Sequence, residues 1–184
     1  MEPRRFWHPT TRELVLLGLL VGLNVVLTRV ASIRIAIGPV EGMRLGFGHL
    51  PVVLASLALG PVAGALTGAL GDLLGYWVQP MGPYMPHFTA AAALGGALPG
   101  LLLRVLPGHR GLTRLVLAVG VPHLLVSCLL VPLILRHLFG IPLGATVVPR
   151  LVAAAFTVPA YALLCRALLE RTRLTPFLSL PPRG

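Results

Sequence analysis

Long apolar segments separated by short glycine- and proline-containing breaks make up most of this chain. Between Leu45 and Leu103 the only Asp, Glu, Lys or Arg is Asp72, and residues 115–135 contain none. Several segments therefore reach or approach the length of about 20 residues that spans a bilayer as a helix. The breaks are rich in turn-forming residues and lie at residues 60–61, 79–87, 107–111 and 139–144. This pattern predicts a multi-pass membrane protein.

The spacing of the breaks predicts six helices, at residues 13–31, 46–59, 62–78, 88–106, 113–137 and 148–169. We expect an all-α integral membrane protein, a six-transmembrane-helix bundle that forms one domain over residues 13–169. Residues 1–12 and 170–184 are expected to be cytoplasmic segments. The second and third helices are short, so they are expected to tilt or to be shielded by their neighbours.

Composition supports the membrane assignment. Of 184 residues, 56% are hydrophobic and 11% are charged, with a mean hydropathy of +0.89, whereas about 25% of the residues in a soluble domain are charged. The first apolar run leads into further spans without a small-x-small cleavage site, so no removable signal peptide is expected. Cys128 and Cys165 lie within apolar segments, where thiols usually serve packing.

All fifteen basic residues are arginine. Without lysine the chain cannot contain the nucleotide-binding G-x-x-x-x-G-K-[ST] loop, so any ATP hydrolysis must come from another chain. With the N-terminus inside, ten arginines fall on inner segments, and the outer ones are Arg29, Arg34, Arg44, Arg136 and Arg150. This bias predicts a cell-membrane protein with both termini in the cytoplasm.

Glycines spaced four residues apart allow membrane helices to approach closely. The third predicted helix has such a stripe, which we expect to pack inside the bundle, at Gly64, Gly68, Gly71 and Gly75. In the first helix, Gly18 and Gly22 form a single G-x-x-x-G step. This pair either packs internally or docks onto a different subunit.

Asp72 is the clearest candidate for chemistry, because an ionisable group inside a membrane normally faces a cavity or a partner. It lies about 16 Å along the third helix, beyond the midplane toward the predicted outer side. The same end holds Arg44 and a connection that carries Tyr84, His87, Phe88 and Thr89.

Two interpretations of this group remain open. In the first, Asp72 forms a buried ion pair with Arg34, Arg44 or Arg150 and holds helices in register. In the second, the group forms an outward-opening pocket, in which arginines bind carboxylates bidentately, aromatic side chains stack on a flat ring and Asp72 accepts hydrogen bonds from ring nitrogens. Apolar walls with a few convergent polar groups are typical of small-molecule sites.

Other polar residues give weaker signals. His123 follows Pro122 and is interpreted as a hydrogen-bonded residue at a helix kink rather than a ligand. Asn24 either lines the pocket or bonds a neighbouring helix. His49, His87 and His123 lack the spacing of a metal site, so neither a metal nor a cofactor is expected. One intramembrane acid without clustered ligands also argues against an intramembrane enzyme.

The stretch from Arg44 to Thr89 resembles the folate-type substrate-binding (S) components of energy-coupling factor (ECF) vitamin transporters. Its matching elements are RLGFGHLP, then GPVAGALTGALGDLLG, then PMGPYMPHFT. Two positions depart from the family pattern, because His49 stands in place of an aromatic residue and His87 in place of glycine. Outside this stretch the similarity is one of length and architecture.

The resemblance implies a non-catalytic subunit that captures folate or a related vitamin from outside. A membrane coupling subunit and two ATPase subunits would then drive import, with Gly18 and Gly22 contacting the partner. The implied substrate-binding residues are Arg34, Arg44, Phe47, His49, Asp72, Tyr84, His87, Phe88, Thr89 and Arg150. The alternatives are an S component for another vitamin or heterocycle, or a six-helix membrane scaffold without transport function.

Overall fold

A computed structural model of the chain describes residues 9–30, 32–37, 40–80, 83–106 and 112–172. For residues 32–37, 40–45 and 169–172 it describes the course of the backbone. Most of the two predicted cytoplasmic segments, residues 1–12 and 170–184, lies outside the described residues.

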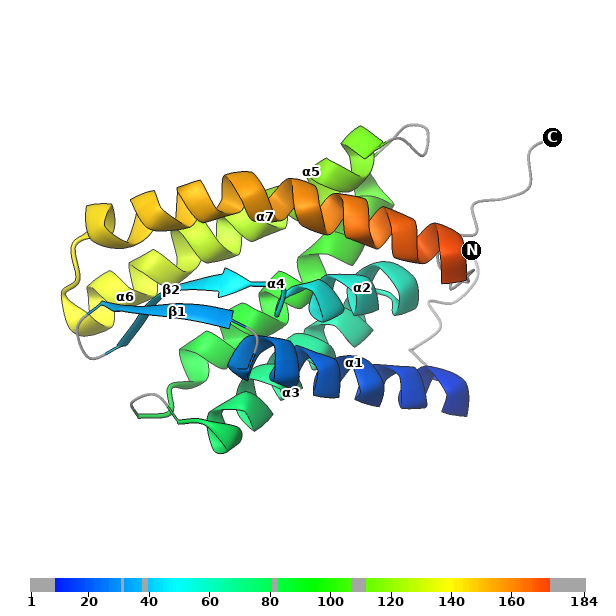
Figure 1. Cartoon of the computed structure of the whole chain (residues 1–184), viewed down its shortest axis with the longest axis horizontal. Coiled ribbons are helices and arrows are strands. Elements are labelled where there is room, and N and C mark those ends of the chain that lie inside the picture. The colour runs from blue at the N-terminus through cyan, green and yellow to red at the C-terminus, as the bar shows by residue number, and fades with distance from the viewer. Residues whose placement is uncertain (1–8, 31, 38–39, 81–82, 107–111, 173–184) are drawn as a thin grey trace.

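The described residues form a helical bundle with one short β-hairpin (Figure 1). In chain order the elements are α1 (Thr11–Arg29), β1 (Ser32–Ile37), β2 (Val40–Gly46), α2 (Leu50–Leu59), α3 (Pro61–Val78), α4 (Pro86–Val105), α5 (Leu112–His123), the π-helix η1 (Leu124–Leu130), α6 (Val131–Phe139) and α7 (Leu143–Thr172). Because α5, η1 and α6 follow one another without a break, they form one rod and correspond to the fifth predicted helix. The predicted six-helix architecture is confirmed.

Within the part of the chain that the structure describes, four helical segments are long and apolar enough to cross a membrane: Thr11–Arg29, Pro86–Val105, Leu112–Phe139 and Leu143–Leu168. Helix α2 is shorter but equally apolar, and eight of its ten residues are buried. It is shielded by its neighbours α3, α4 and α1, with which it makes its most extensive contacts. The expectation that this short helix is covered by other helices is confirmed.

Local sequence explains where the helices begin and end. Helix α1 starts with a capping box, in which the Thr10 hydroxyl accepts from the Glu13 amide and the Glu13 carboxylate accepts from the Thr10 amide. Prolines occupy the first turn of α2, α3 and α4, where a missing N–H costs little. Gly60, between α2 and α3, has a φ of 103°, a conformation that glycine adopts without strain.

The hairpin was not predicted, and its residues were assigned to a connection and to the start of the second helix. β1 and β2 pair antiparallel, with Arg34 opposite Arg44 and a register shift between Ile35 and Ala36. Alternating isoleucines in Ser32–Ile37 are a strand pattern of ordinary length, which the prediction of helical spans passed over. The second helix therefore begins at Leu50 and not at residue 46. β2 packs against α7, and β1 touches α1.

The glycine stripe of α3 packs inside the bundle, as expected. A Cβ at Gly64 would overlap the backbone carbonyl of Gly96, and one at Gly68 would overlap that of Ala92. Helices α3 and α4 consequently form the most extensive contact of the fold. In contrast, a Cβ at Gly18 or Gly22 of α1 would meet no atom of the described residues within 4 Å, so this pair does not pack within the described bundle.

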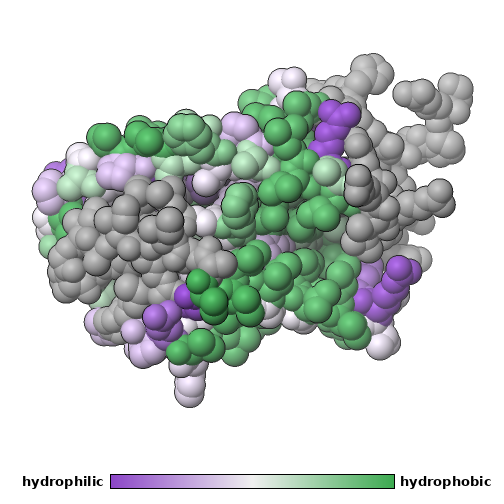
Figure 2. All heavy atoms as spheres, viewed as in Figure 1, coloured by the Kyte–Doolittle hydropathy of each residue, from purple (hydrophilic) through white to green (hydrophobic). Residues whose placement is uncertain are grey.

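The outer surface carries many apolar side chains (Figure 2). Leu19 is 68% exposed, Phe156 75% and Trp77 80%, values suited to contact with lipid. Trp77 lies in the last turn of α3, and tryptophan is enriched where membrane meets water. Cys128 and Cys165 are buried, free thiols, in agreement with a packing role.

Candidate functional site

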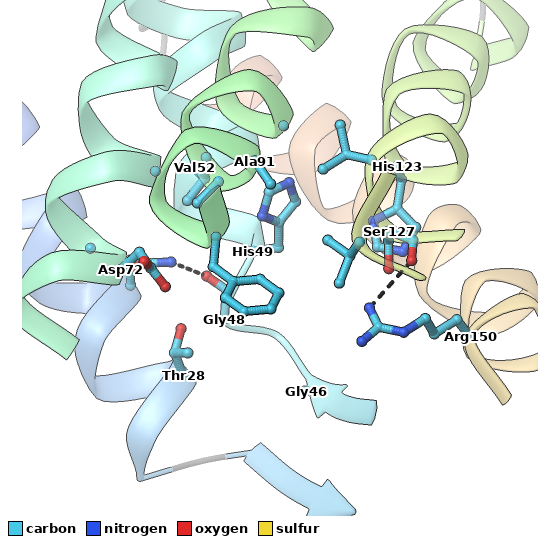
Figure 3. Close-up of a pocket in the computed structure, with 18 of the residues that line it drawn as sticks. Thr28, Gly46, Gly48, His49, Val52, Asp72, Ala91, His123, Ser127 and Arg150 are labelled. Atoms are coloured by element: carbon cyan, nitrogen blue, oxygen red, sulfur yellow. Dashed lines mark hydrogen bonds between the residues drawn. The ribbon is translucent and has the colours of Figure 1, made fainter. Parts of the chain in front are cut away.

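A cavity of about 350 Å³ lies between α1, the β2–α2 connection, α3, α4, the α5–η1–α6 rod and α7. Its size falls in the range of about 300–1,000 Å³ typical of small-molecule pockets. Much of its wall is apolar or glycine, including Val52, Ala91 and Val126. A few polar side chains reach it from different helices, among them Asp72 and Arg150 (Figure 3).

Asp72 lines this cavity from α3. The hydroxyl of Thr89 donates to its carboxylate at 2.7 Å, and the hydroxyls of Thr89 and Tyr84 are 3.0 Å apart. The ring of Tyr84 lies 5.3 Å from that of Tyr76, measured between centroids. Among residues whose side chains the structure describes, no arginine forms an ion pair with Asp72. The carboxylate thus belongs to a hydroxyl network at the cavity wall.

Arg150 reaches the cavity from α7, and one guanidinium nitrogen donates to the Ser127 carbonyl at 3.2 Å. In Figure 3 it lies on the side opposite Asp72. The side chains of Arg34 and Arg44, the other two predicted arginines, lie outside the described part of the chain.

Two imidazoles and a phenol form a further part of the wall. The ring centroids of His49 and His123 are 6.0 Å apart, and those of His123 and Tyr161 are 6.2 Å apart. His49 immediately precedes α2, and the Tyr161 hydroxyl donates to the Gly46 carbonyl at 2.7 Å. Within the described residues, no group of three or more His, Cys, Asp or Glu side chains could hold a metal ion.

The interpretation of His123 as a kink residue missed its place in the cavity wall. Tyr161 was missed as well, although a signal was present. One face of α7 carries four residues, at i, i+3, i+7 and i+11, that all line the cavity: Arg150, Ala153, Thr157 and Tyr161. Arg150 was already predicted to bind substrate, so following the same helix face from Arg150 along α7 would have identified Tyr161.

The structure brings together five of the predicted substrate-binding residues as cavity-lining side chains: His49, Asp72, Tyr84, Phe88 and Arg150. Three others lie elsewhere. Thr89 stands behind Asp72 and bonds it. Phe47 is 49% exposed, with its ring 6.3 Å from that of Tyr161, and His87 is exposed. Neither Phe47 nor His87 lines the cavity.

Helix α1 also contributes to the wall. Asn24 lines the cavity, which is one of the two roles considered for it, and its amide donates at 2.6 Å to the Gly48 carbonyl in the β2–α2 connection and not to a neighbouring helix. Because Gly71 has no side chain, it leaves the space that the Asn24 carboxamide occupies. Thr28 and Arg29, which sequence reasoning did not assign to the site, line the same side.

Comparison with known proteins identifies the family. Residues 8–166 match the family described as ECF-type riboflavin transporter, S component. The chain belongs to the S components of ECF-type transporters. It is therefore a multi-pass membrane subunit of a transport system and not an enzyme, and the family resemblance read from Arg44 to Thr89 is confirmed.

Relatives with known names support this assignment over nearly the whole chain. The folate transporter FolT of Clostridium novyi (strain NT) is 30% identical over 151 residues, which cover 82% of this chain and 84% of the relative. A structure of FolT bound with folic acid has 25% identity and a TM-score of 0.73, covering 90% of this chain and 96% of that one.

Two other solved structures share the fold of this S component. One is the S component of a bacterial ECF transporter, with 24% identity, a TM-score of 0.62 and coverage of 92% of this chain and 98% of that one. The other is the S component for biotin from an ECF-type ABC transporter, with 17% identity, a TM-score of 0.67 and coverage of 90% and 95%. The six-helix bundle is thus shared by S components with different substrates.

Proposed function

We propose that this S component binds folate, or a closely related vitamin, in the cavity between Asp72 and Arg150. The observation that carries this proposal is that an acid and a guanidinium line the same cavity from different helices. Folate has a flat pterin ring with N–H donors at one end and a glutamate tail with two carboxylates at the other. Each end finds its chemical complement in the pocket.

The ring end would be bound by the Asp72 network. A carboxylate accepts hydrogen bonds from ring N–H groups, and Tyr84 and Phe88 offer aromatic faces beside it. The tail would be bound by Arg150, with Arg34 and Arg44 as further candidates, because guanidinium groups bind carboxylates bidentately. His49, which departs from the family pattern, lies between these two ends in Figure 3 and would contact the middle of the ligand.

Riboflavin is the second candidate, because the matching family description names it. It is a flat heterocycle too, but it carries no carboxylate. A guanidinium that lines a mostly apolar cavity is better matched by an anionic ligand. The FolT relatives, one of them bound with folic acid, also favour folate.

We further infer that the subunit lies in the cell membrane with both termini in the cytoplasm and the cavity accessible from outside. A membrane coupling subunit and two ATPase subunits would drive import, since this chain has no lysine and hence no nucleotide loop. The exposed, unfilled surface at Gly18 and Gly22 supports α1 as the docking helix.

A thermal-shift series on the purified protein in detergent tests this proposal. Folic acid, riboflavin and biotin are added separately, and a ligand that binds only the folded state raises the melting temperature by mass action. We expect a concentration-dependent rise with folic acid. A rise with riboflavin or biotin alone would transfer the assignment to that vitamin, and no rise with any of the three would point to another vitamin or heterocycle as the substrate of this S component.

A further inference from the structure

We propose that Pro132 is a positioning residue for Arg150: it opens a turn of the fifth span and frees the Ser127 carbonyl to hold the guanidinium at the cavity. The consequence for ligand binding rests on the proposed function, but the positioning itself does not.

The argument starts from the backbone hydrogen bonds of the rod. In a regular α-helix the Ser127 carbonyl would accept from the amide of Val131, four residues later. Here the Val131 amide donates instead to the Val126 carbonyl, five residues back, as it does in a π-helix. A π-helical bond to Ser127 would then have to come from residue 132. That residue is proline, which has no N–H.

The Ser127 carbonyl is therefore left without either of these helical donors, because the Val131 amide bonds Val126 and Pro132 has no N–H. A backbone carbonyl at membrane depth needs a donor, because lipid cannot supply one. Arg150 supplies it from α7, through the 3.2 Å bond to the Ser127 oxygen. The proline ring itself is fully buried in the bundle, so the opened turn is a fixed part of the fold.

This bond helps to orient a long side chain. A guanidinium has five N–H donors, and the bond to the Ser127 carbonyl uses one of them to direct the head group. A side chain held in place before the ligand arrives loses less rotational freedom on binding. Ser127 and Arg150 both line the cavity, so the fixed head group lies where an anionic end of the ligand would sit.

Folic acid titrations of four proteins test the ligand consequence: wild type, Pro132→Ala, Arg150→Gln and the double variant. Alanine allows a backbone N–H to compete with Arg150 for the Ser127 carbonyl: that of residue 132 if the turn stays π-helical, and that of Val131 if it becomes α-helical. We expect Pro132→Ala to weaken folic acid binding about three- to tenfold, and to have little further effect when Arg150 is already glutamine. If the fold losses in folic acid affinity of the two single variants multiply in the double variant, the two residues act independently and the proposal is wrong.

Pro159→Ala is the matched control. Pro159 also lies inside a membrane helix, α7, but it is exposed and does not line the cavity. Its replacement should leave folic acid binding unchanged in both the wild-type and the Arg150→Gln backgrounds. Pro132→Val, which restores the same N–H at nearly the volume of proline, is the second variant if the alanine protein does not fold.

A measurement without ligand separates this proposal from the function proposed above. The guanidinium nitrogens of Arg150 are observed by NMR in ¹⁵N-arginine-labelled protein in nanodiscs, with Arg150→Gln to assign them. We expect Pro132→Ala to shift these signals and Pro159→Ala to leave them in place. If the Pro132 variants leave them unchanged, the positioning role is wrong, whichever vitamin binds.

Discussion

The Thr89 hydroxyl donates a 2.7 Å hydrogen bond to the Asp72 carboxylate and so joins the first turn of α4 to α3 at the cavity wall. The same hydroxyl lies 3.0 Å from that of Tyr84. Asp72 is thereby held by neutral hydroxyl groups, and it also lies beside the amino end of α4, where the helix dipole favours an anion. Such a carboxylate can still accept further hydrogen bonds from a ligand.

Replacing Thr89 by valine is expected to weaken folic acid binding about three- to tenfold. Valine has nearly the same shape but cannot donate, so Asp72 loses a bond of the kind that contributes about 1.5–3 kcal/mol when one partner is charged. Part of that loss is recovered by rearrangement of Tyr84 or the ligand. Equilibrium titration measures the change, and Thr89→Ser, which keeps the hydroxyl, should bind nearly as wild type. Equal binding by the valine variant would show that Asp72 needs no such support.

Replacing Asp72 by asparagine is expected to weaken folic acid binding by about 1 kcal/mol or more, because a charged acceptor becomes a neutral one. The comparison requires a folded variant, so the melting temperature without ligand is measured first. Unchanged affinity in a folded Asp72→Asn protein would remove this residue from the binding role proposed for it.

The Asn24 bond to the Gly48 carbonyl is expected to matter for stability. Leucine at position 24 cannot donate, and leaving a buried acceptor without its donor costs about 1–3 kcal/mol. The melting temperature of the ligand-free protein should fall. Leu23→Ala is the control, since Leu23 is 43% exposed on the adjoining surface of the same helix. A melting temperature lowered equally by both changes would point to α1 packing and not to this bond.

Bulk on the exposed surface of α1 is expected to separate binding from transport. Gly18→Leu combined with Gly22→Leu fills a surface that touches nothing else in the described chain, so folic acid binding should persist. Uptake by cells that contain the full transporter should be lost if this surface docks onto the coupling subunit. The control adds bulk at the same spacing on α7, through Val148→Leu with Val152→Leu at positions 60% and 58% exposed. Uptake that survives the α1 changes would place the docking surface elsewhere.

The bundle was predictable because membrane spans are long, and a single apolar run is enough to identify each one. Helix α5–η1–α6 was thus predicted as one span, but its internal π-turn was not, because it depends on where individual amides donate. The β-hairpin was missed because its residues were assigned to a connection between two spans. Its register comes from pairing between the two strands, which a single strand does not reveal.

The site was predictable where the residue type is costly in a membrane. Asp72 and Arg150 stood out for that reason, and both line the cavity. Tyr161 and His123 did not stand out, because tyrosine and histidine occur in helices for packing reasons too. Phe47 and His87 were included because they lie in the stretch that resembles the family, but neither side chain lines the cavity.

The central claim is that the cavity between Asp72 and Arg150 is a folate site, and calorimetric titration of the purified wild-type S component with folic acid and with riboflavin tests it most directly. The account predicts saturable binding of folic acid at one site per chain, weakened in Asp72→Asn and in Arg150→Gln. Saturable binding of riboflavin with no binding of folic acid, or folic acid binding that both variants leave unchanged, would contradict it.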